Sequence, residues 1–385
     1  MKNKMLLAIL SFVLAAGVLV PNDKIFRAKG VCVQTKSYQW VLPKGFPVPR
    51  VPADNPMTAA KVELGRYLFY DVRLSLNQTT SCATCHRQEL AFTDGRAKAI
   101  GATGQAHPRS SMSLTNVAYA PTLAWANPSM TLLERQPLVP LFGEHPVEMG
   151  MAGKEQQLLT RIKAEPTYQL LFNNAYPDEG DPYTLGNVTK ALASFVRTLI
   201  SGDSPYDRYK YQGEAEAISA GAKRGEALFF GERLECFDCH TGFNLSGPTD
   251  DAGKAFVENS FENNGLYNLD GKGAYPGENT GVFEITANPN DMGKFKIPTL
   301  RNIAVTAPYM HDGSIPNLRR VLDHYSAGGR TIRTGQFAGN GHLSPLKSNL
   351  VRGFHLTERE KQDVILFLQS LTDEKFLKNP KLSKP

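Results

Sequence analysis

Two short motifs place a pair of thiols and an imidazole close together in the chain. Cysteine, two residues, cysteine and histidine follow one another at positions 82–86 and again at positions 236–240. This run is the attachment signature of c-type haem, because the two thiols add to the haem vinyl groups and the adjacent histidine binds the iron. The sequence therefore predicts two covalent haem c groups. Their anchors would be Cys82, Cys85, Cys236 and Cys239, and their proximal iron ligands His86 and His240.

Two other chemistries use the same cysteine spacing. The four cysteines together would suit a tetrahedral zinc site, and each pair alone would suit a redox-active dithiol of the thioredoxin type. Neither alternative explains why a histidine follows both pairs directly. Covalent haem is therefore the preferred interpretation.

The segments before the two motifs repeat one design. Residues 65–75 and 225–235 share a glycine, a phenylalanine four positions later and an Arg-Leu pair. Both glycines fall on helical segments, where a missing side chain lets another helix approach closely. An amphipathic segment closes each copy, at residues 195–199 and 367–371. The repeat predicts a mainly α fold with two cytochrome c-like haem domains in tandem.

Domain limits follow from this repeat. We expect an N-terminal cytochrome c-like domain at residues 41–200 and a C-terminal one at 201–372, followed by a basic tail at 373–385. Gly, Asn and Pro are dense from residue 246 to 298, where strand signals are weak. That stretch is typical of a long functional loop or a short hairpin.

Composition narrows the class of protein. The 385 residues carry a formal net charge of +6 without a dense basic patch, which argues against nucleic acid as a partner. Hydrophobic residues make up 41% of the chain, enough to build a core without disulfides. Four of the five cysteines lie in the two motifs, which leaves Cys32 as a lone thiol.

The first residues are typical of export. Lys2 and Lys4 precede an apolar run at residues 5–20, which is short for a membrane span. We expect residues 1–28 to be a signal peptide or an N-terminal membrane anchor. The rest of the protein would then be in the periplasm.

Longer motifs resemble a known family. Residues 295–302 (FKIPTLRN) and 306–313 (TAPYMHDG), together with both haem motifs and Val-Glu-Met at 147–149, resemble bacterial dihaem cytochrome c peroxidases and the related MauG enzymes. The resemblance covers most of the chain, from about residue 43 to 372. It implies that the N-terminal haem reacts with hydrogen peroxide and that the C-terminal haem stores or relays electrons.

The sixth ligand of the second haem distinguishes branches of this family. Conventional peroxidases have a methionine fourteen residues after the histidine that matches His311; here that position is Tyr325, and the last methionine is Met310. MauG-type enzymes carry a tyrosine ligand in a similar Tyr-x-x-Gly-Gly setting. Residues 318, 321, 322 and 325 also share one face of a predicted helix at 317–327. The alternative is a core tyrosine bonded at a helix end.

The residues expected around the first haem also differ from those of conventional peroxidases, as in MauG-type enzymes. Their removable distal histidine matches Ala102 here, and His107 is five residues later, where it suits a supporting role better than ligation. By resemblance, Glu148 is the general base and then acid that moves a proton between the peroxide oxygens. Gln136 would orient the peroxide. The longer spacing between Gln136 and Glu148 leaves Glu144 as a substitute.

Two further sites are implied only by the resemblance. Trp125 matches a tryptophan between the haems that relays a hole, although interdomain packing would explain an indole there equally well. A calcium ion would be bound by the backbone oxygens of Thr306 and Pro308. The usual asparagine of that site is replaced by Ser110, which weakens the calcium assignment.

These expectations combine into one function with two rivals. The chain would react with hydrogen peroxide, form a high-valent state shared over both haems and oxidise a residue of a partner protein. Residues 40–47 and 264–271 resemble the MbnH-type subgroup, which converts a tryptophan of a copper-binding partner to kynurenine. The first rival is a conventional cytochrome c peroxidase supplied with electrons by a small cytochrome. The second is a non-enzymatic dihaem electron carrier.

Overall fold

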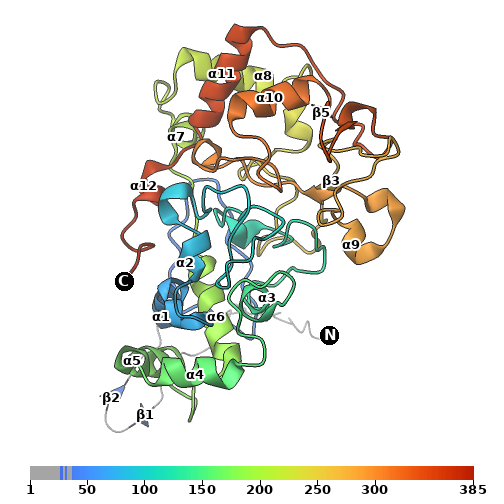
Figure 1. Ribbon diagram of the computed structural model, residues 1–385. Coiled ribbons are helices and arrows are strands. Elements are labelled where there is room, and N and C mark those ends of the chain that lie inside the picture. Colours follow the sequence, from blue (N-terminus) through green and yellow to red (C-terminus); the bar gives the residue numbers. More distant parts are fainter. Residues whose placement is uncertain (1–26, 29–30, 33–36) are drawn as a thin grey trace, which may run out of the picture. The chain divides into compact units, whose positions relative to one another are not determined.

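A computed structural model describes residues 27–28, 31–32 and 37–385 (Figure 1). The chain divides into a unit at residues 1–36 and a unit at residues 37–385. In the first unit, strands β1 (Arg27–Ala28) and β2 (Val31–Cys32) pair antiparallel. The expected signal peptide or anchor lies outside the described residues, apart from the two residues of β1.

The second unit is mainly helical with little sheet. Its helices are α1 (Ala59–Tyr70), α2 (Cys82–Cys85), α3 (Leu138–Phe142), α4 (Glu155–Lys163), α5 (Pro166–Ala175), α6 (Leu185–Val196), α7 (Pro205–Gln212), α8 (Ala220–Phe229), α9 (Phe283–Thr286), α10 (Leu318–Ser326), α11 (Glu358–Gln369) and α12 (Glu374–Leu377). Short 3-10 turns lie at Val72–Leu74, Gln88–Leu90, Val117–Tyr119, Cys236–Asp238, Pro289–Asp291, Ile303–Val305 and Gly341–Leu343. Two pairs of two-residue strands complete it: β3 (Phe261–Glu262) with β4 (Phe295–Lys296), and β5 (Thr331–Ile332) with β6 (Gly339–Asn340).

Two helix pairs form the framework that positions the haem motifs. α1 packs on α6 in the first half and α8 packs on α11 in the second (Figure 1). A side chain at Gly65 would come within 1.9 Å of the Ala191 carbonyl oxygen, and one at Gly225 within 2.0 Å of the Asp363 carbonyl oxygen. The two glycines thus allow the same close contact in both halves. The predicted role of the repeated glycines is confirmed.

Each helix pair has its own apolar core. The first core gathers side chains from α1, α4, α5 and α6, and the second gathers them from α8, α10 and α11. The segment expected as a basic tail takes part in the first core, where Phe376, Leu377 and Leu382 are buried. The Tyr70 hydroxyl also donates to the Leu382 carbonyl oxygen at 2.7 Å.

Long irregular segments connect these elements. Residues 246–298 contain only β3, β4, α9 and one 3-10 turn, and β3 and β4 pair antiparallel with Phe261 opposite Lys296. The stretch is therefore a long loop, the first of the two expected alternatives, because the 32 residues between β3 and β4 make their pairing something other than a short hairpin. Among the described residues, no helix has the length and apolar character needed to cross a membrane.

Candidate functional site

The first Cys-x-x-Cys-His run forms the one-turn helix α2 and its end. The His86 backbone N–H donates to the Cys82 carbonyl oxygen at 2.9 Å, which closes the turn. The His86 ring Nδ1 lies 2.8 Å from the Phe92 carbonyl oxygen. Because a carbonyl only accepts, Nδ1 carries the proton and Nε2 is left with a lone pair. Burial lowers the pKa of His86, so the ring is neutral, as iron ligation requires.

The second run has the same local geometry in a 3-10 turn. The His240 N–H donates to the Cys236 carbonyl oxygen at 2.9 Å, and the ring Nδ1 lies 3.2 Å from the Leu245 carbonyl oxygen. Burial lowers the pKa of His240 to about 4. Leu245 has a φ of +48° and its counterpart Phe92 has +61°, so left-handed backbone aims the accepting carbonyl in both sites.

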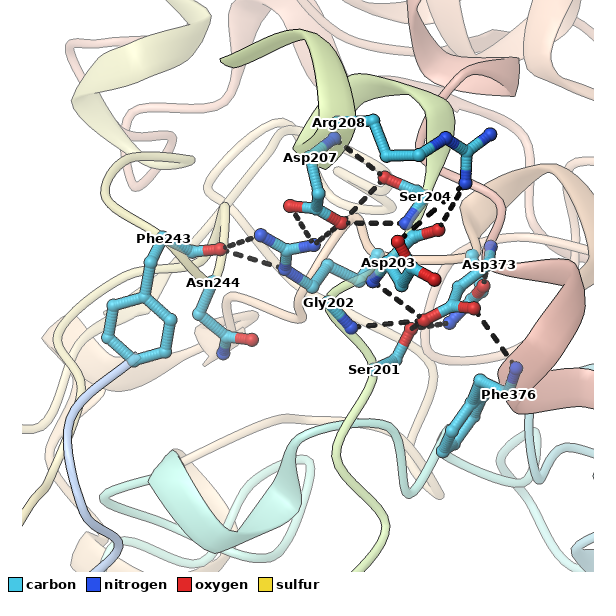
Figure 2. A network of polar contacts seen from close by, with 12 residues as sticks. Ser201, Gly202, Asp203, Ser204, Asp207, Arg208, Phe243, Asn244, Asp373 and Phe376 are labelled. Carbon is cyan, nitrogen blue, oxygen red and sulfur yellow. Dashed lines mark hydrogen bonds and ion pairs between the residues drawn. The ribbon is translucent and has the colours of Figure 1, made fainter. Parts of the chain in front are cut away.

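A buried ion pair holds the loop that follows His240. The Arg301 guanidinium donates to the Asp207 carboxylate at 2.7 Å and 2.8 Å, and its Nε–H donates to the Phe243 carbonyl oxygen at 2.8 Å. Asp207 and Phe243 are labelled in Figure 2. Both charged side chains are 1% exposed. A fully buried arginine is stable only with its charge and N–H groups satisfied, and here they are. Arg301 therefore fixes the loop that ends in the carbonyl of Leu245.

The same network connects the two halves of the chain. The Asp373 carboxylate accepts from the Gly202 and Asp203 backbone N–H groups at 3.0 Å each, and from the Ser201 hydroxyl at 3.1 Å (Figure 2). The Asn116 amide donates to the Ser201 carbonyl oxygen at 3.0 Å. The linker near residue 201 is thus fixed by buried polar contacts on both sides.

Glu148 lies near the first pair of cysteines. Its backbone is fixed because the Ala102 N–H donates to the Glu148 carbonyl oxygen at 2.6 Å. Burial raises the pKa of the Glu148 carboxyl to about 7, and the charge of this carboxylate adds to the effect of burial in raising the pKa of the Cys82 and Cys85 thiols. A carboxyl with a pKa near neutrality is suited to take up and return a proton.

His107 faces this carboxylate. Its Nδ1 accepts from the Arg109 backbone N–H at 3.0 Å, which leaves the proton on Nε2, and Nε2 lies 4.0 Å from Glu148 Oε1. Burial, followed by the nearby Arg109 charge, lowers the pKa of His107 to about 4, so the ring is neutral. His107 therefore presents an N–H to Glu148.

Gln136 and Glu144 are the other two residues expected near the first motif. Gln136 is half-buried in the turn before α3, and its side chain has no hydrogen bond within residues 37–385. The segment after it is close to Glu148, because the Met149 N–H donates to the Pro140 carbonyl oxygen at 2.8 Å. Glu144 is exposed, which favours Glu148 over this substitute.

Trp125 lies where the two halves meet. Its indole N–H donates to the Ser110 carbonyl oxygen at 3.0 Å, and its own carbonyl oxygen accepts from the Lys296 N–H at 2.8 Å. The indole also lines a cavity whose walls come from residues 112–122 and from residues 244–248 and 296–299. Trp125 therefore contacts the surroundings of both haem motifs.

Tyr325 is the counterpart of Glu148 at the second motif. It lies on α10, which begins after Asn317 and contains the predicted apolar face. Burial raises the pKa of the Tyr325 phenol to about 12; the Cys239 and Cys236 thiols add to this rise, and a hydrogen bond from the Asn264 side chain opposes it. The phenol is thus beside the second pair of cysteines and has a hydrogen-bond donor.

The structure also places residues that the sequence pattern did not assign. The Asn264 amide lies 3.3 Å from the Met310 sulfur, so a thioether approaches the same place as Tyr325. In the sequence, Asn264 is distinguished only as part of the segment 264–271 that resembles the MbnH-type subgroup. No pattern in the nearby sequence predicts its contact with Met310. Asp207 and Arg301 are 94 residues apart, and nothing in their spacing predicts the pair.

Ser110 contacts the residues that follow the expected calcium ligands in the chain. The Ser110 N–H donates to the His311 carbonyl oxygen at 2.9 Å and its hydroxyl to the Met310 carbonyl oxygen at 3.2 Å. Within residues 37–385, no hydrogen bond is directed to the carbonyl oxygens of Thr306 or Pro308. The described part of the chain has no cluster of three or more His, Cys, Asp or Glu side chains suited to a metal ion, so calcium would depend on such backbone oxygens.

Comparisons with known proteins agree with this chemistry. The model of the di-haem cytochrome c peroxidase family matches residues 59–216. The methylamine utilization protein MauG of Methylorubrum extorquens is 35% identical over 334 residues, 86% of this chain and 83% of that protein. The cytochrome-c peroxidase IdrP1 of Denitromonas iodatirespirans is 35% identical over 354 residues, 87% of this chain and 88% of that protein.

A solved structure is more similar still. The crystal structure of a MauG-like protein associated with microbial copper homeostasis is 48% identical, with a TM-score of 0.88, and covers 91% of this chain and 99% of that one.

Proposed function

Because the chain belongs to the di-haem cytochrome c peroxidase and MauG family, whose members are haem oxidoreductases acting on peroxide, we propose that it is a periplasmic enzyme that oxidises a residue of a partner protein. The observation that carries this proposal is Tyr325, a half-buried phenol near enough to Cys236 and Cys239 for them to raise its pKa, at the position where a conventional peroxidase has a methionine. The similarity to the MauG-like protein associated with copper homeostasis supports the same branch.

The two motifs fit two haem c groups. Each has two thiols one turn apart, and each histidine has its Nδ1 on a backbone carbonyl, which leaves the lone pair on Nε2. In our assignment His86 and His240 are the proximal ligands, and the four motif cysteines are the anchors. When bound, the haems supply the redox chemistry with peroxide and hold the oxidising equivalents.

Glu148 moves the proton in this scheme. As a carboxylate it would accept a proton from one oxygen of the peroxide and return that proton to the other oxygen. Its pKa of about 7 suits both steps. His107 faces Oε1 with its Nε2 at 4.0 Å, which is too far for a direct hydrogen bond. Ala102 provides no side chain able to ligate iron, and Gln136 would orient the peroxide.

Tyr325 and Trp125 act between the haems and the partner. A phenolate is a hard, anionic ligand that favours the higher oxidation states of iron, and the Asn264 side chain favours the phenolate by its hydrogen bond. Trp125, bonded to Ser110 on one side and to the Lys296 backbone on the other, would relay a hole between the two haems. Calcium bound by the carbonyls of Thr306 and Pro308 would hold the segment beside Ser110.

The decisive experiment is a peroxide titration of the diferric protein. We expect reaction without prior reduction, with a near-infrared charge-resonance band that disappears when a tryptophan-bearing, copper-binding partner is added. Mass spectrometry of that partner should show conversion of tryptophan to kynurenine. If turnover instead requires one-electron reduction and consumes reduced cytochrome c, the proposal is wrong.

A conventional cytochrome c peroxidase is the second candidate. It is favoured by the 35% identity to a cytochrome-c peroxidase and by the Met310 sulfur 3.3 Å from the Asn264 amide, where a methionine ligand could compete with Tyr325. In that case the donor is a small cytochrome. Spectra of the ferric protein distinguish the two, because thioether and phenolate ligation give different charge-transfer bands.

A further inference from the structure

The polar side chains of the segment Phe295–Asn302 form hydrogen bonds or ion pairs with other described residues, except for one. Thr299 donates to the Asn244 carbonyl oxygen, Arg301 bonds Asp207 and Phe243, and the Asn302 amide donates to the Ser201 hydroxyl at 3.0 Å. The exception is Lys296. Its ammonium has no hydrogen bond or ion pair with any residue from 37 to 385.

The backbone of Lys296 is held firmly. Its N–H donates to the Trp125 carbonyl oxygen at 2.8 Å, and in β4 it pairs with Phe261 of β3. Burial alone lowers the pKa of the ammonium to about 8, since no carboxylate is near enough to raise it. Lys294, two positions earlier, places its ammonium 3.1 Å from the Asp291 carboxylate. Lys296 is half-buried, and an ammonium that gives up part of its hydration without an anionic partner costs free energy, so its place in the cavity suits an anionic ligand.

The cavity lined by Lys296 lies between the two haem motifs. Met112 and Pro298 also line it. Two other lining residues contact the histidine loops: the Ser113 hydroxyl donates to the Ala91 carbonyl oxygen at 2.6 Å, next to Phe92, and the Thr299 hydroxyl donates to the Asn244 carbonyl oxygen, next to Leu245. One wall of the cavity therefore touches the surroundings of each proximal histidine. An anion held here would be close to both haem sites.

We propose that the Lys296 ammonium binds the propionate carboxylate of one of the two haems. The inference rests on the proposed function only in requiring two haem c groups. In haem c the thioether bonds form at the vinyl edge, so the propionates extend from the opposite edge, away from the cysteines. A carboxylate there satisfies the charge and the N–H donors of Lys296 together. It also places a fixed cation near the haem, which favours ferrous over ferric iron.

The test is the pair of haem midpoint potentials, measured by spectroelectrochemistry in the full-length protein. In Lys296→Met, we expect both haems to remain attached and one potential to become more negative. Lys296→Arg should stay close to wild type, because it keeps the charge. Lys294→Met is the matched control, since it removes a neighbouring ammonium that already has a carboxylate partner.

The potential that moves identifies the haem concerned. If both potentials in Lys296→Met equal those in Lys294→Met, the inference is overturned. Should Lys296→Met fail to fold, Lys296→Gln makes the same comparison with a polar side chain of similar length. A wild-type protein that carries fewer than two haems would contradict the proposed function instead, and mass spectrometry separates that outcome from unchanged potentials.

Discussion

The two Cys-x-x-Cys-His sites are alike around the histidine and differ in the side chains that approach the cysteines. In both, the ring Nδ1 is held by a carbonyl of left-handed backbone, at 2.8 Å for His86 and 3.2 Å for His240. Beside the first cysteines is Glu148, whose pKa is about 7, and beside the second is Tyr325, whose pKa is about 12. One duplicated design thus carries a proton-transfer group at one site and a potential anionic ligand at the other.

The largest effect expected concerns the second site. Tyr325→His should keep both haems attached but abolish the near-infrared band formed with peroxide, because a neutral imidazole replaces the hard phenolate. The matched control is Tyr67→His on α1, in the other half of the chain. A full-yield band in Tyr325→His would show that Tyr325 is not the ligand that matters.

At the first site, Glu148→Gln should slow the reaction of the diferric protein with peroxide by about 10²- to 10⁴-fold, the usual contribution of a general acid-base group. Stopped-flow spectroscopy of the Soret band measures the rate. Glu144→Gln changes an exposed carboxylate four residues away and should have no effect. Equal losses in both variants would remove Glu148 from the mechanism.

The Arg301–Asp207 pair that holds the loop after His240 is buried, whereas the ion pair in the loop after His86, Arg87 with Glu89, is exposed. Asp207→Asn should lower the free energy of unfolding by about 3–5 kcal/mol, because it leaves the Arg301 charge buried without its anion. Asp181→Asn removes an exposed pair with Lys163 and should cost at most about 1 kcal/mol. Denaturant unfolding gives both values, and equal values would show that burial of the pair is unimportant.

The repeated glycines test whether the two halves are equivalent in packing. Gly65→Ala and Gly225→Ala should each destabilise the protein by about 1–3 kcal/mol, because the new methyl group would overlap a carbonyl of the facing helix. Gly180→Ala, which meets no atom within 4 Å, is the control. A large difference in melting temperature between the first two variants would show that the halves do not share one packing design.

The smallest effect is the pH dependence at the first site. The pKa of Glu148 is raised to about 7, so the carboxylate base is present above this pH and is lost below it. The rate constant with peroxide should be half-maximal near pH 7 and fall about tenfold per unit below pH 6. Stopped-flow measurements from pH 5 to 9 check this. A flat profile would mean that another group accepts the proton.

Patterns among residues near one another in sequence predicted much of the fold. They did not predict which residues distant in the chain contact each other. The haem motifs and the helix that carries Tyr325 depend on residues near one another in sequence, so spacing was sufficient. The repeated glycines at 65 and 225 marked where another helix could approach closely, but not that Ala191 and Asp363 would be the residues facing them. The partners of Arg301 and Asn264 depend on how distant loops fold together, and no periodicity encodes that. Sequence similarly singled out Glu148 without revealing that an N–H of His107 faces it.

The packing of residues 376–382 against the first core bears on how the chain folds. Phe376, Leu377 and Leu382 are buried with side chains of α1, and the Tyr70 and Leu382 contact spans 312 residues. The first half is therefore incomplete until this distant segment arrives, and contacts of such sequence separation form slowly. Cutting the chain near residue 201 should thus yield an N-terminal fragment with an open apolar surface. Adding residues 373–385 in trans should restore its ordered fold.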